Sequence, residues 1–348
     1  MAESKEQKMW QACTDGDLEI VQELASDSAV DVNWGDAEIG RTPFYRACFY
    51  GRTKVVEYLM RNPRVDVTKP QNKGGFPFYI SCQEGHREVV SLLLGDPRID
   101  PNMQVSDEAT PFFMACQEHH KEVVSLLLAD PRIDPNKPKN DGVTPFFKVC
   151  QKGHNDVVSL LLADPRIDLN KPDHDHCTPL WMASQNGHLV IAQHLLASGK
   201  EIDTKRRSAF NHKTAAEHGR RVVPRGVGDT EENHTRKKTN GPLCADLIDE
   251  YERDPVAAGN RLRRLPELRE YFVGHLFALV VFHSDDFVVI NERASSFIRR
   301  FFRITSRLPL DLQMVLCNRV FGSPRDIILS KYSEPYFKCL ARTTTWQQ

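Results

Sequence analysis

Apolar positions between residues 42 and 204 fall into two kinds of short helical segment. One kind reads Val-Val-Ser-Leu-Leu-Leu, at Val89–Leu94, Val123–Leu128 and Val157–Leu162. The other follows a Thr-Pro pair and continues through an apolar stretch such as Phe146–Gln151. A threonine hydroxyl caps a helix start, and proline is tolerated at the first helical position because its missing N–H has no partner there. The pattern therefore predicts pairs of short helices.

Glycine and proline mark where these helices end. The first helix of a pair is followed by Gly51, Gly85, Gly153 or Gly187, the residue type that favours a left-handed helix end. The second helix runs into Asp-Pro-Arg-Ile-Asp, where proline cannot continue it. The residues that remain in each unit predict an extended turn that projects between successive pairs.

These helix pairs recur with a fixed period. Units begin at residues 42, 76, 110, 144 and 178, each 34 residues after the last. Repeats of this length are single supersecondary units that bury their apolar faces only by stacking on neighbours. The expected fold class is all-α, a repeat solenoid followed by a small all-α domain.

The repeated elements resemble the ankyrin repeat. They are Thr-Pro, Gly-His, a Val-Val-x-x-Leu-Leu helix and a closing Asp-x-Asn turn, and they cover residues 8–219. The resemblance implies a divergent capping repeat over 1–41, then repeats with a terminal half-repeat over 42–219. It also implies a non-catalytic module that binds partner proteins on its concave face and turn tips.

Three features depart from the family pattern. Asp-Pro-Arg-Ile-Asp replaces Gly-Ala-Asp, and His119 replaces the inter-helix glycine of its unit. An aromatic stripe replaces the family's histidine, and it is either packed between first helices or exposed as a groove. Its members are Tyr45, Tyr79, Phe113, Phe147 and Trp181.

Residues that recur once per unit are interpreted as structural. Cys48, Cys82, Cys116 and Cys150 lie 34 residues apart and are expected in the core, and the histidine of each Gly-His pair is expected to make structural hydrogen bonds. His174, His176 and Cys177 form a group that no other unit has. They are either zinc ligands that lack a fourth partner or part of a solvated turn, and we expect no metal and no cofactor.

Variation between near-identical units marks the candidate partner-binding residues. The helix frame is repeated almost unchanged, whereas the pair that ends each first helix and the turn tips vary. The candidates are Phe49, Tyr50, Asn72, Lys73, Gln83, Glu84, Ser106, Asp107, Gln117, Glu118, Asn140, Asp141, Gln151, Lys152, His174, Asp175, His176, Gln185 and Asn186. The alternative is neutral drift at exposed positions.

The remainder of the chain predicts a basic linker over 220–242 and a helical domain over 243–348. Helices are expected at Leu243–Tyr251, Leu262–Leu268 and Tyr271–Phe282, and from Ala294 onward. Leu308-Pro309-Leu310, with Leu312 and Leu316, resembles an F-box-like module, which implies a ubiquitin-ligase adaptor as a possible partner. Lys205–Arg207 and Arg236–Lys238 are interpreted as part of a solvated linker, with nuclear import or nucleic-acid contact as the alternatives.

Charge and composition limit the remaining function classes. The net charge of −1 combines −9 over residues 1–204, +6 over 205–242 and +2 over 243–348. No nucleophile, glycine-rich loop or metal spacing indicates an enzyme. With no apolar run long enough for a bilayer and no secretory signal, we expect a cytoplasmic monomer, with a nuclear location as the alternative. Nucleic acid and membranes are not expected partners.

Overall fold

The computed structural model describes residues 3–220, 229–284, 313, 314 and 317. Every regular element within these residues is a helix, as the sequence predicts. The helices are α1 Lys5–Asp15, α2 Leu18–Ser26, α3 Pro43–Phe49, α4 Thr53–Met60, α5 Pro77–Gln83, α6 Arg87–Leu94, α7 Pro111–Gln117, α8 Lys121–Ala129, α9 Pro145–Lys152, α10 Asn155–Ala163, α11 Pro179–Gln185, α12 Leu189–Ala197, α13 Ala215–Gly219, α14 Glu231–Arg253, α15 Pro255–Leu262 and α16 Pro266–Ser284.

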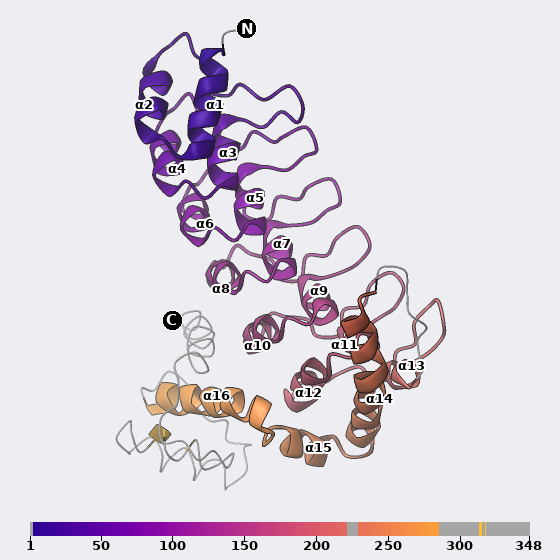
Figure 1. The fold of residues 1–348 in the computed structure, drawn as a ribbon. Coiled ribbons are helices and arrows are strands. Elements are labelled where there is room, and N and C mark those ends of the chain that lie inside the picture. The colour runs from indigo at the N-terminus through magenta and orange to yellow at the C-terminus, as the bar shows by residue number, and fades with distance from the viewer. Residues whose placement is uncertain (1–2, 221–228, 285–312, 315–316, 318–348) are drawn as a thin grey trace. The chain divides into compact units, whose positions relative to one another are not determined.

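The chain divides into two compact units, residues 1–149 and 150–348. In the first unit, first helices α1, α3, α5 and α7 stack in one layer and second helices α2, α4, α6 and α8 stack in another (Figure 1). Loops between successive helix pairs project from the side of the first helices (Figure 1). This is the predicted arrangement of helix pairs with projecting turns.

Thr-Pro starts most first helices as expected. The hydroxyls of Thr42 and Thr110 accept hydrogen bonds from the N–H groups of Tyr45 and Phe113, each at 3.1 Å. Helix α5 begins after Phe76, which supplies no side-chain cap. The helices also end as predicted, because Gly51, Gly85, Gly153 and Gly187 all have positive φ. His119 has a φ of +66° and adopts the same left-handed conformation without being glycine.

The Asp-Pro-Arg-Ile-Asp segment does more than stop a helix. Arg98 donates from Nη2 to the carbonyl of Met60, at the end of the preceding second helix, over 3.0 Å. The same guanidinium pairs with Asp96, two residues earlier, at 2.6 Å. Arg132 and Asp130 repeat both contacts one unit later, where Arg132 reaches Leu94 O at 2.6 Å. Each of these arginines therefore ties its own turn to the end of the previous repeat.

The asparagine of the closing Asp-x-Asn turn links successive turns as well. Asn102 donates from Nδ2 to Arg132 O at 2.6 Å, and its Oδ1 accepts from Asp134 N–H at 2.9 Å. Asn33 makes the same two bonds to residues 64 and 66. Side-chain amides thus satisfy backbone groups that irregular turns leave unpaired.

In the second unit the predicted linker is wrong over residues 231–242, which form the first half of α14. This helix packs against α11, α12 and α13. Its Arg236 Nε donates to Asn186 O at 3.1 Å, and Asn240 Nδ2 donates to Gly187 O at 3.0 Å. Residues 231–240 carry no apolar period, so contacts with the last full repeat, rather than an apolar stripe of its own, stabilise this end of the helix.

Further helices follow with boundaries that differ from the prediction. Helix α15 covers residues 255–262 rather than 262–268, and the helix expected at 271–282 begins earlier, at Pro266. Both helices contact α12. Val273, Phe277, Val280 and Cys317 form a buried apolar cluster. The other predicted helices, from residue 294 on, lie outside the described residues apart from a few positions.

Candidate partner-binding surface

Candidates at the ends of first helices in the first unit are accessible to different degrees. Tyr50 is 39% exposed, which is unusual for a large aromatic side chain in this chain. Phe49 is half-buried. In the next two repeats a glutamine takes the place of Phe49 and a glutamate that of Tyr50. There Gln83 and Gln117 are half-buried, and each donates to the glutamate that follows it, at 3.2 Å to Glu84 and 2.8 Å to Glu118.

Turn tips of the first unit project their side chains to solvent. The exposed candidates are Asn72, Lys73, Ser106, Asn140 and Asp141, while Asp107 is half-buried. Backbone bonds join neighbouring tips, from Asn72 N–H to Ile39 O at 2.7 Å and from Asn140 N–H to Asp107 O at 3.2 Å. The tips are therefore joined in pairs, and each pair holds its variable side chains at a fixed spacing.

One ion pair also crosses between tips. Lys139 Nζ lies 2.7 Å from the carboxylate of Asp107. Burial alone would raise the pKa of Asp107, but the Lys139 contact and the N–H of Ala109 outweigh it and the pKa is lowered. This carboxylate is already engaged, so Asp107 is less available to a partner than Asn140 or Asp141.

Candidates of the second unit are in different surroundings. Lys152, His174, Asp175 and His176 are exposed, and Gln151 is half-buried. Gln185 and Asn186 are half-buried, and α14 lies on Asn186 through the Arg236 bond. That pair therefore carries an intramolecular contact at the place where the other repeats leave their variable pair accessible.

Histidines of the Gly-His pairs make the structural hydrogen bonds that were expected. Nε2 of His86, His120 and His188 lies 2.8, 2.7 and 3.1 Å from a carbonyl at the end of the preceding first helix. Burial, with Arg236 nearby, lowers the pKa of His188 to about 4. These rings hold one repeat to the next.

Recurring cysteines are core residues, as predicted. Cys48, Cys82, Cys116 and Cys150 are each 0% exposed. Burial raises the pKa of all four thiols far above the ordinary value. A buried thiol without a nearby cation is a poor nucleophile and a poor metal ligand.

The aromatic stripe is mostly packed inside the protein. Tyr45 is 3% exposed, and Phe113, Phe147 and Trp181 are each 1% exposed, whereas Tyr79 is half-buried. Burial raises the pKa of the Tyr45 hydroxyl to about 12. The first of the two interpretations is therefore correct at these four positions, and they do not line an exposed groove.

The group at residues 174–177 does not present three ligands together. Cys177 is buried with its pKa raised to about 12 by that burial, and its Sγ lies 3.8 Å from Asp175 O. His174 and His176 are exposed on the turn. In the part of the chain that the structure describes, no group of three His, Cys, Asp or Glu side chains is arranged to hold a metal ion.

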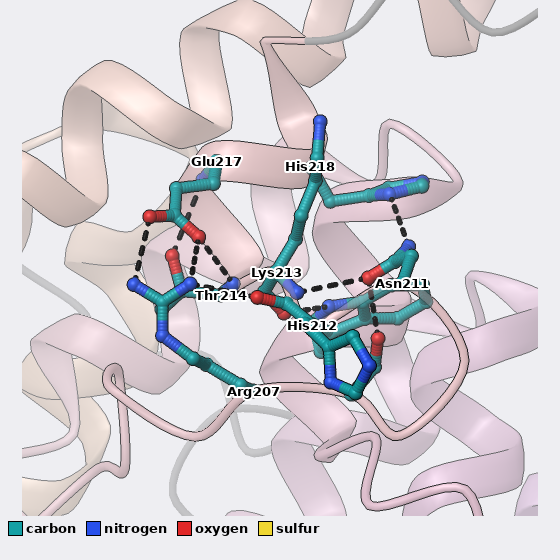
Figure 2. A network of polar contacts seen from close by, with 9 residues as sticks. Arg207, Asn211, His212, Lys213, Thr214, Glu217 and His218 are labelled. Carbon is teal, nitrogen blue, oxygen red and sulfur yellow. Dashed lines mark hydrogen bonds and ion pairs between the residues drawn. The ribbon is translucent and has the colours of Figure 1, made fainter.

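The half-repeat after the last full repeat is held by the polar network in Figure 2. The guanidinium of Arg207 pairs in a fork with Glu217, with contacts of 2.8 and 2.9 Å. Glu217 also accepts from Thr214 N–H at 3.0 Å, which completes a capping box at the start of α13. The N–H of Thr214 and then Arg207 lower the pKa of Glu217. Asn211 Nδ2 lies 3.0 Å from His218 Nδ1 (Figure 2).

Both basic clusters are engaged within the second unit. Arg206 pairs with Asp203 at 2.9 Å, and Lys237 pairs with Asp229 at 2.9 Å. Arg207 and Arg236 make the contacts described above. Four of the six basic side chains in Lys205–Arg207 and Arg236–Lys238 thus have intramolecular partners, which argues against an open cationic surface for nucleic acid.

The residues that sequence reasoning missed lie around Tyr50. The guanidinium of Arg46 lies between two aromatic rings, 4.2 Å from the centroid of Trp10 and 4.6 Å from that of Tyr50. Its Nη2 donates to the Tyr50 hydroxyl at 3.1 Å. A comparison of repeats position by position contains the signal, because the equivalents of Arg46 in the two following repeats are Ile80 and Met114.

The described helices include none that is long and apolar enough to span a bilayer.

Comparison with known proteins identifies the repeats. A family model described as ankyrin repeats in three copies matches residues 9–105, 64–139 and 112–206, which together cover more than half of the 348 residues. No curated protein sequence matches the chain. The crystal structure of the ankyrin repeat domain of Bcl-3, described as a unique member of the IkappaB protein family, is similar. It is 19% identical, with a TM-score of 0.52 over 60% of this chain and 92% of that one.

The ankyrin repeat domain of human ASB11 is similar as well. It is 22% identical, with a TM-score of 0.53 over 69% of this chain and 96% of that one. At these identities the two structures show the fold, an all-helical ankyrin solenoid. Ankyrin repeats are generally protein–protein interaction modules. The chain belongs to the ankyrin repeat family.

Proposed function

We propose that this protein is a non-catalytic, monomeric adaptor that binds partner proteins on the first-helix ends and turn tips of its repeats. One observation carries the proposal. Positions that vary between near-identical repeats, such as Tyr50, Glu118 and Asn140, are exposed. The unchanged frame contains buried positions such as Val89 and exposed ones such as Arg98, so exposure alone does not produce the variation. A surface that only had to be soluble would not concentrate its variation on one set of positions.

The geometry of the tips supports this function. Backbone bonds join the tips in pairs and fix the spacing within each pair, so variable side chains are presented without a large loss of conformational entropy on binding. The capping repeat at 1–41 and the half-repeat of the 42–219 segment cover the ends of the stack, as repeat proteins require. Partner specificity then resides in the exposed side chains.

A pair of matched triple variants tests the proposal. The tip variant is Lys73→Glu, Glu118→Lys, Asp141→Lys. The control is Lys54→Glu, Glu88→Lys, Glu122→Lys, at exposed positions of the second helices. Both sets change the net charge by the same amount. Partners would be identified by affinity purification of the full chain from its native cells and quantified by mass spectrometry.

We expect the tip variant to lose at least tenfold of the specific partner signal and the control to retain it. A tenfold loss corresponds to about 1.4 kcal/mol of binding free energy, within the range of a few interface contacts. Equal retention by both variants would refute the proposal, as would loss in the control alone.

A second candidate function is substrate receptor of a ubiquitin ligase. It is favoured by the sequence Leu308-Pro309-Leu310-Asp311-Leu312, which resembles the start of an F-box-like module and lies outside the described residues. Pull-down with a ligase adaptor subunit tests it. Binding no stronger than that of the Leu308→Ala, Pro309→Ala variant would count against it.

A further inference from the structure

Three arginines and three aromatic residues gather where the first two repeats meet. We call them the cationic–aromatic cluster: Trp10, Arg41, Arg46, Phe49, Tyr50 and Arg52. Phe49 and Tyr50 pack edge to face at 4.9 Å between ring centroids. The guanidinium groups of Arg41 and Arg52 lie 5.7 Å from the Phe49 ring and 5.9 Å from the Tyr50 ring, respectively. All six residues belong to the first compact unit.

The guanidinium groups of this cluster form no close ion pair within the described part of the chain, although Arg41 is near enough to Asp36 to help lower the pKa of that carboxyl. Among the residues that the structure describes, no carboxylate lies within 4 Å of Arg41, Arg46 or Arg52, although most other arginines of the repeats pair with one. Arg46 is 8% exposed, and the buried Nε of Arg41 has no hydrogen-bond acceptor. Burying a cation without a counter-charge is costly, so these groups favour an anion from outside the chain.

Comparison of repeats shows which atoms of Arg52 are needed to stack one repeat on the next and which are not. The residues at its position in later repeats are His86, His120 and His188, which contact a carbonyl of the previous repeat. Arg52 makes the same contact with Nε alone, 2.8 Å from Thr14 O. Histidine would therefore suffice for stacking, and the two terminal nitrogens of Arg52 are additional to that requirement.

The same comparison applies to the other members. Positions equivalent to Phe49 and Tyr50 carry Gln-Glu in the next two repeats, and only this repeat has an aromatic pair there. Tyr50 is the exposed member, at 39%. Tyrosine and arginine are both enriched among the residues that supply most of the binding energy at protein interfaces. Residues 1–204 are otherwise acidic, with a net charge of −9, so the cluster is a local cationic site on an acidic array.

We propose that the cationic–aromatic cluster binds an acidic segment of a partner protein, whose Asp or Glu carboxylates pair with Arg41, Arg46 and Arg52 while an apolar side chain packs on Tyr50. Arginine pairs with carboxylates in a fork, and aromatic faces beside it keep the guanidinium oriented. The acidic surroundings oppose a long polyanion, which favours a short acidic peptide over nucleic acid. This inference rests on the proposed adaptor function and names the partner chemistry of one part of its surface.

The test uses residues that the protein itself places at equivalent positions. The variant Arg46→Met, Arg52→His introduces the side chains of Met114 and His120, so the frame keeps residues compatible with stacking. The control Arg61→Gln, Arg87→Gln removes two exposed arginines whose ion pairs lie on second helices. Both variants lose two positive charges, and thermal unfolding by circular dichroism confirms that each is folded.

Random 12-residue peptides displayed on phage would be selected on the immobilised full chain. The enriched peptide would then be synthesised with a fluorescent label, and its Kd measured by anisotropy. We expect selected peptides to be enriched in Asp and Glu with an aromatic or Leu residue. We also expect Kd to rise at least tenfold for Arg46→Met, Arg52→His, to stay within twofold for the control, and to rise with added salt.

Several results would overturn the inference. They are selection of no peptide, selection of peptides without acidic enrichment, and a Kd for Arg46→Met, Arg52→His within twofold of wild type. Two further ligands would be measured: the selected peptide with every Glu replaced by phosphoserine, and a labelled single-stranded oligonucleotide. If either binds much more tightly than the acidic peptide, and does so through the cluster, that ligand class replaces the acidic peptide and the inference is overturned. If neutral peptides are selected and lose binding in the tip variant, the adaptor proposal stands while this inference fails.

Discussion

Substitution of Gly85 by alanine tests the joint between repeats. Gly85 has a φ of +78°, and an added Cβ would lie 2.3 Å from Nδ1 of His120. That ring would have to leave its 2.7 Å contact with Gln83 O. A left-handed alanine costs about 1–2 kcal/mol, and loss of a hydrogen bond costs about 0.5–1.5 kcal/mol. We therefore expect Gly85→Ala to reduce the free energy of unfolding by about 2–3 kcal/mol.

Gly95 provides the matched control ten residues later. Its φ is −76°, and the nearest atom to an added Cβ is Leu92 O at 3.5 Å, an ordinary contact. Gly95→Ala should therefore stabilise the protein by about 0.4–1 kcal/mol, because alanine restricts the unfolded chain. The two variants make the same chemical change with opposite expected signs.

Both effects are measured by unfolding the full chain in urea and monitoring circular dichroism. The shift in the urea midpoint gives the change in the free energy of unfolding, provided that its dependence on urea concentration stays the same. A His120→Ala background separates the two costs, because Gly85→Ala should then cost only the backbone strain of about 1–2 kcal/mol. The reasoning is refuted if Gly85→Ala costs under about 0.5 kcal/mol, or if Gly95→Ala destabilises the protein equally.

Four further predictions follow from single sites. His119→Gly should raise the melting temperature, because a left-handed His is less favourable than Gly by about 1 kcal/mol; an unchanged or lower melting temperature contradicts this. Burial lowers the pKa of His194 to about 4 in the folded protein. The unfolded chain therefore takes up a proton first as pH falls below about 6.5, so stability is lost from there down to pH 4, and this residue accounts for about 2 kcal/mol at pH 5. Urea midpoints at pH 7 and 5 should show the loss, and a His194→Gln variant should show less of it. Cys48, Cys82 and Cys116 should resist a short pulse of thiol reagent at pH 8 and react in urea, as judged by mass spectrometry. Titration with Zn²⁺ should show no stoichiometric uptake that depends on His174 and His176; uptake abolished by alanine at both would contradict this.

The repeats could be predicted from the sequence because each local signal agrees with the others. Thr-Pro, a glycine at the helix end and Asp-Pro-Arg mark boundaries by local chemistry, and the structure places helix ends where these residues occur. Burial of the cysteines follows from their recurrence at one position of the first helix. The helix boundaries depend on residues close by in the sequence, and the burial of the cysteines depends on contact with the equivalent residues of the adjacent repeat.

Helix α14 could not be predicted in the same way. Residues 231–240 are polar, and Gly241-Pro242 is a typical helix break, yet the helix continues through both. The position of this helix depends on its contacts with α11, α12 and α13, whose residues come earlier in the chain. For instance, a Cβ added at residue 241 would lie 2.7 Å from the carbonyl oxygen of Gly219, and one added at residue 219 would lie 2.6 Å from that of Gly241, so only two glycines allow the approach of α13 and α14. Such a contact leaves no periodic signal in either segment.

The cationic–aromatic cluster was missed for a different reason. Its residues come from α1, the turn before α3, α3 with its C-cap Tyr50, and the N-cap of α4. Only folding brings the guanidinium of Arg46 within 4.2 Å of the centre of the Trp10 ring. The sequence did identify Phe49 and Tyr50 as variable. It gave no indication that three arginines that form no close ion pair within the described part of the chain surround them.

The arginine link between repeats has a consequence for how such a chain can change its length. Each unit brings one donor, such as Arg98 or Arg132, and one acceptor at the end of its own second helix, such as Leu94 O. A tandem duplication or deletion of 34 residues inside the array would leave every donor opposite an acceptor. Only the ends need other solutions, and at the last full repeat Arg263, from outside the repeats, donates to Ala197 O at 2.8 Å. Recombination within the gene can therefore lengthen or shorten the recognition surface without redesigning a single interface.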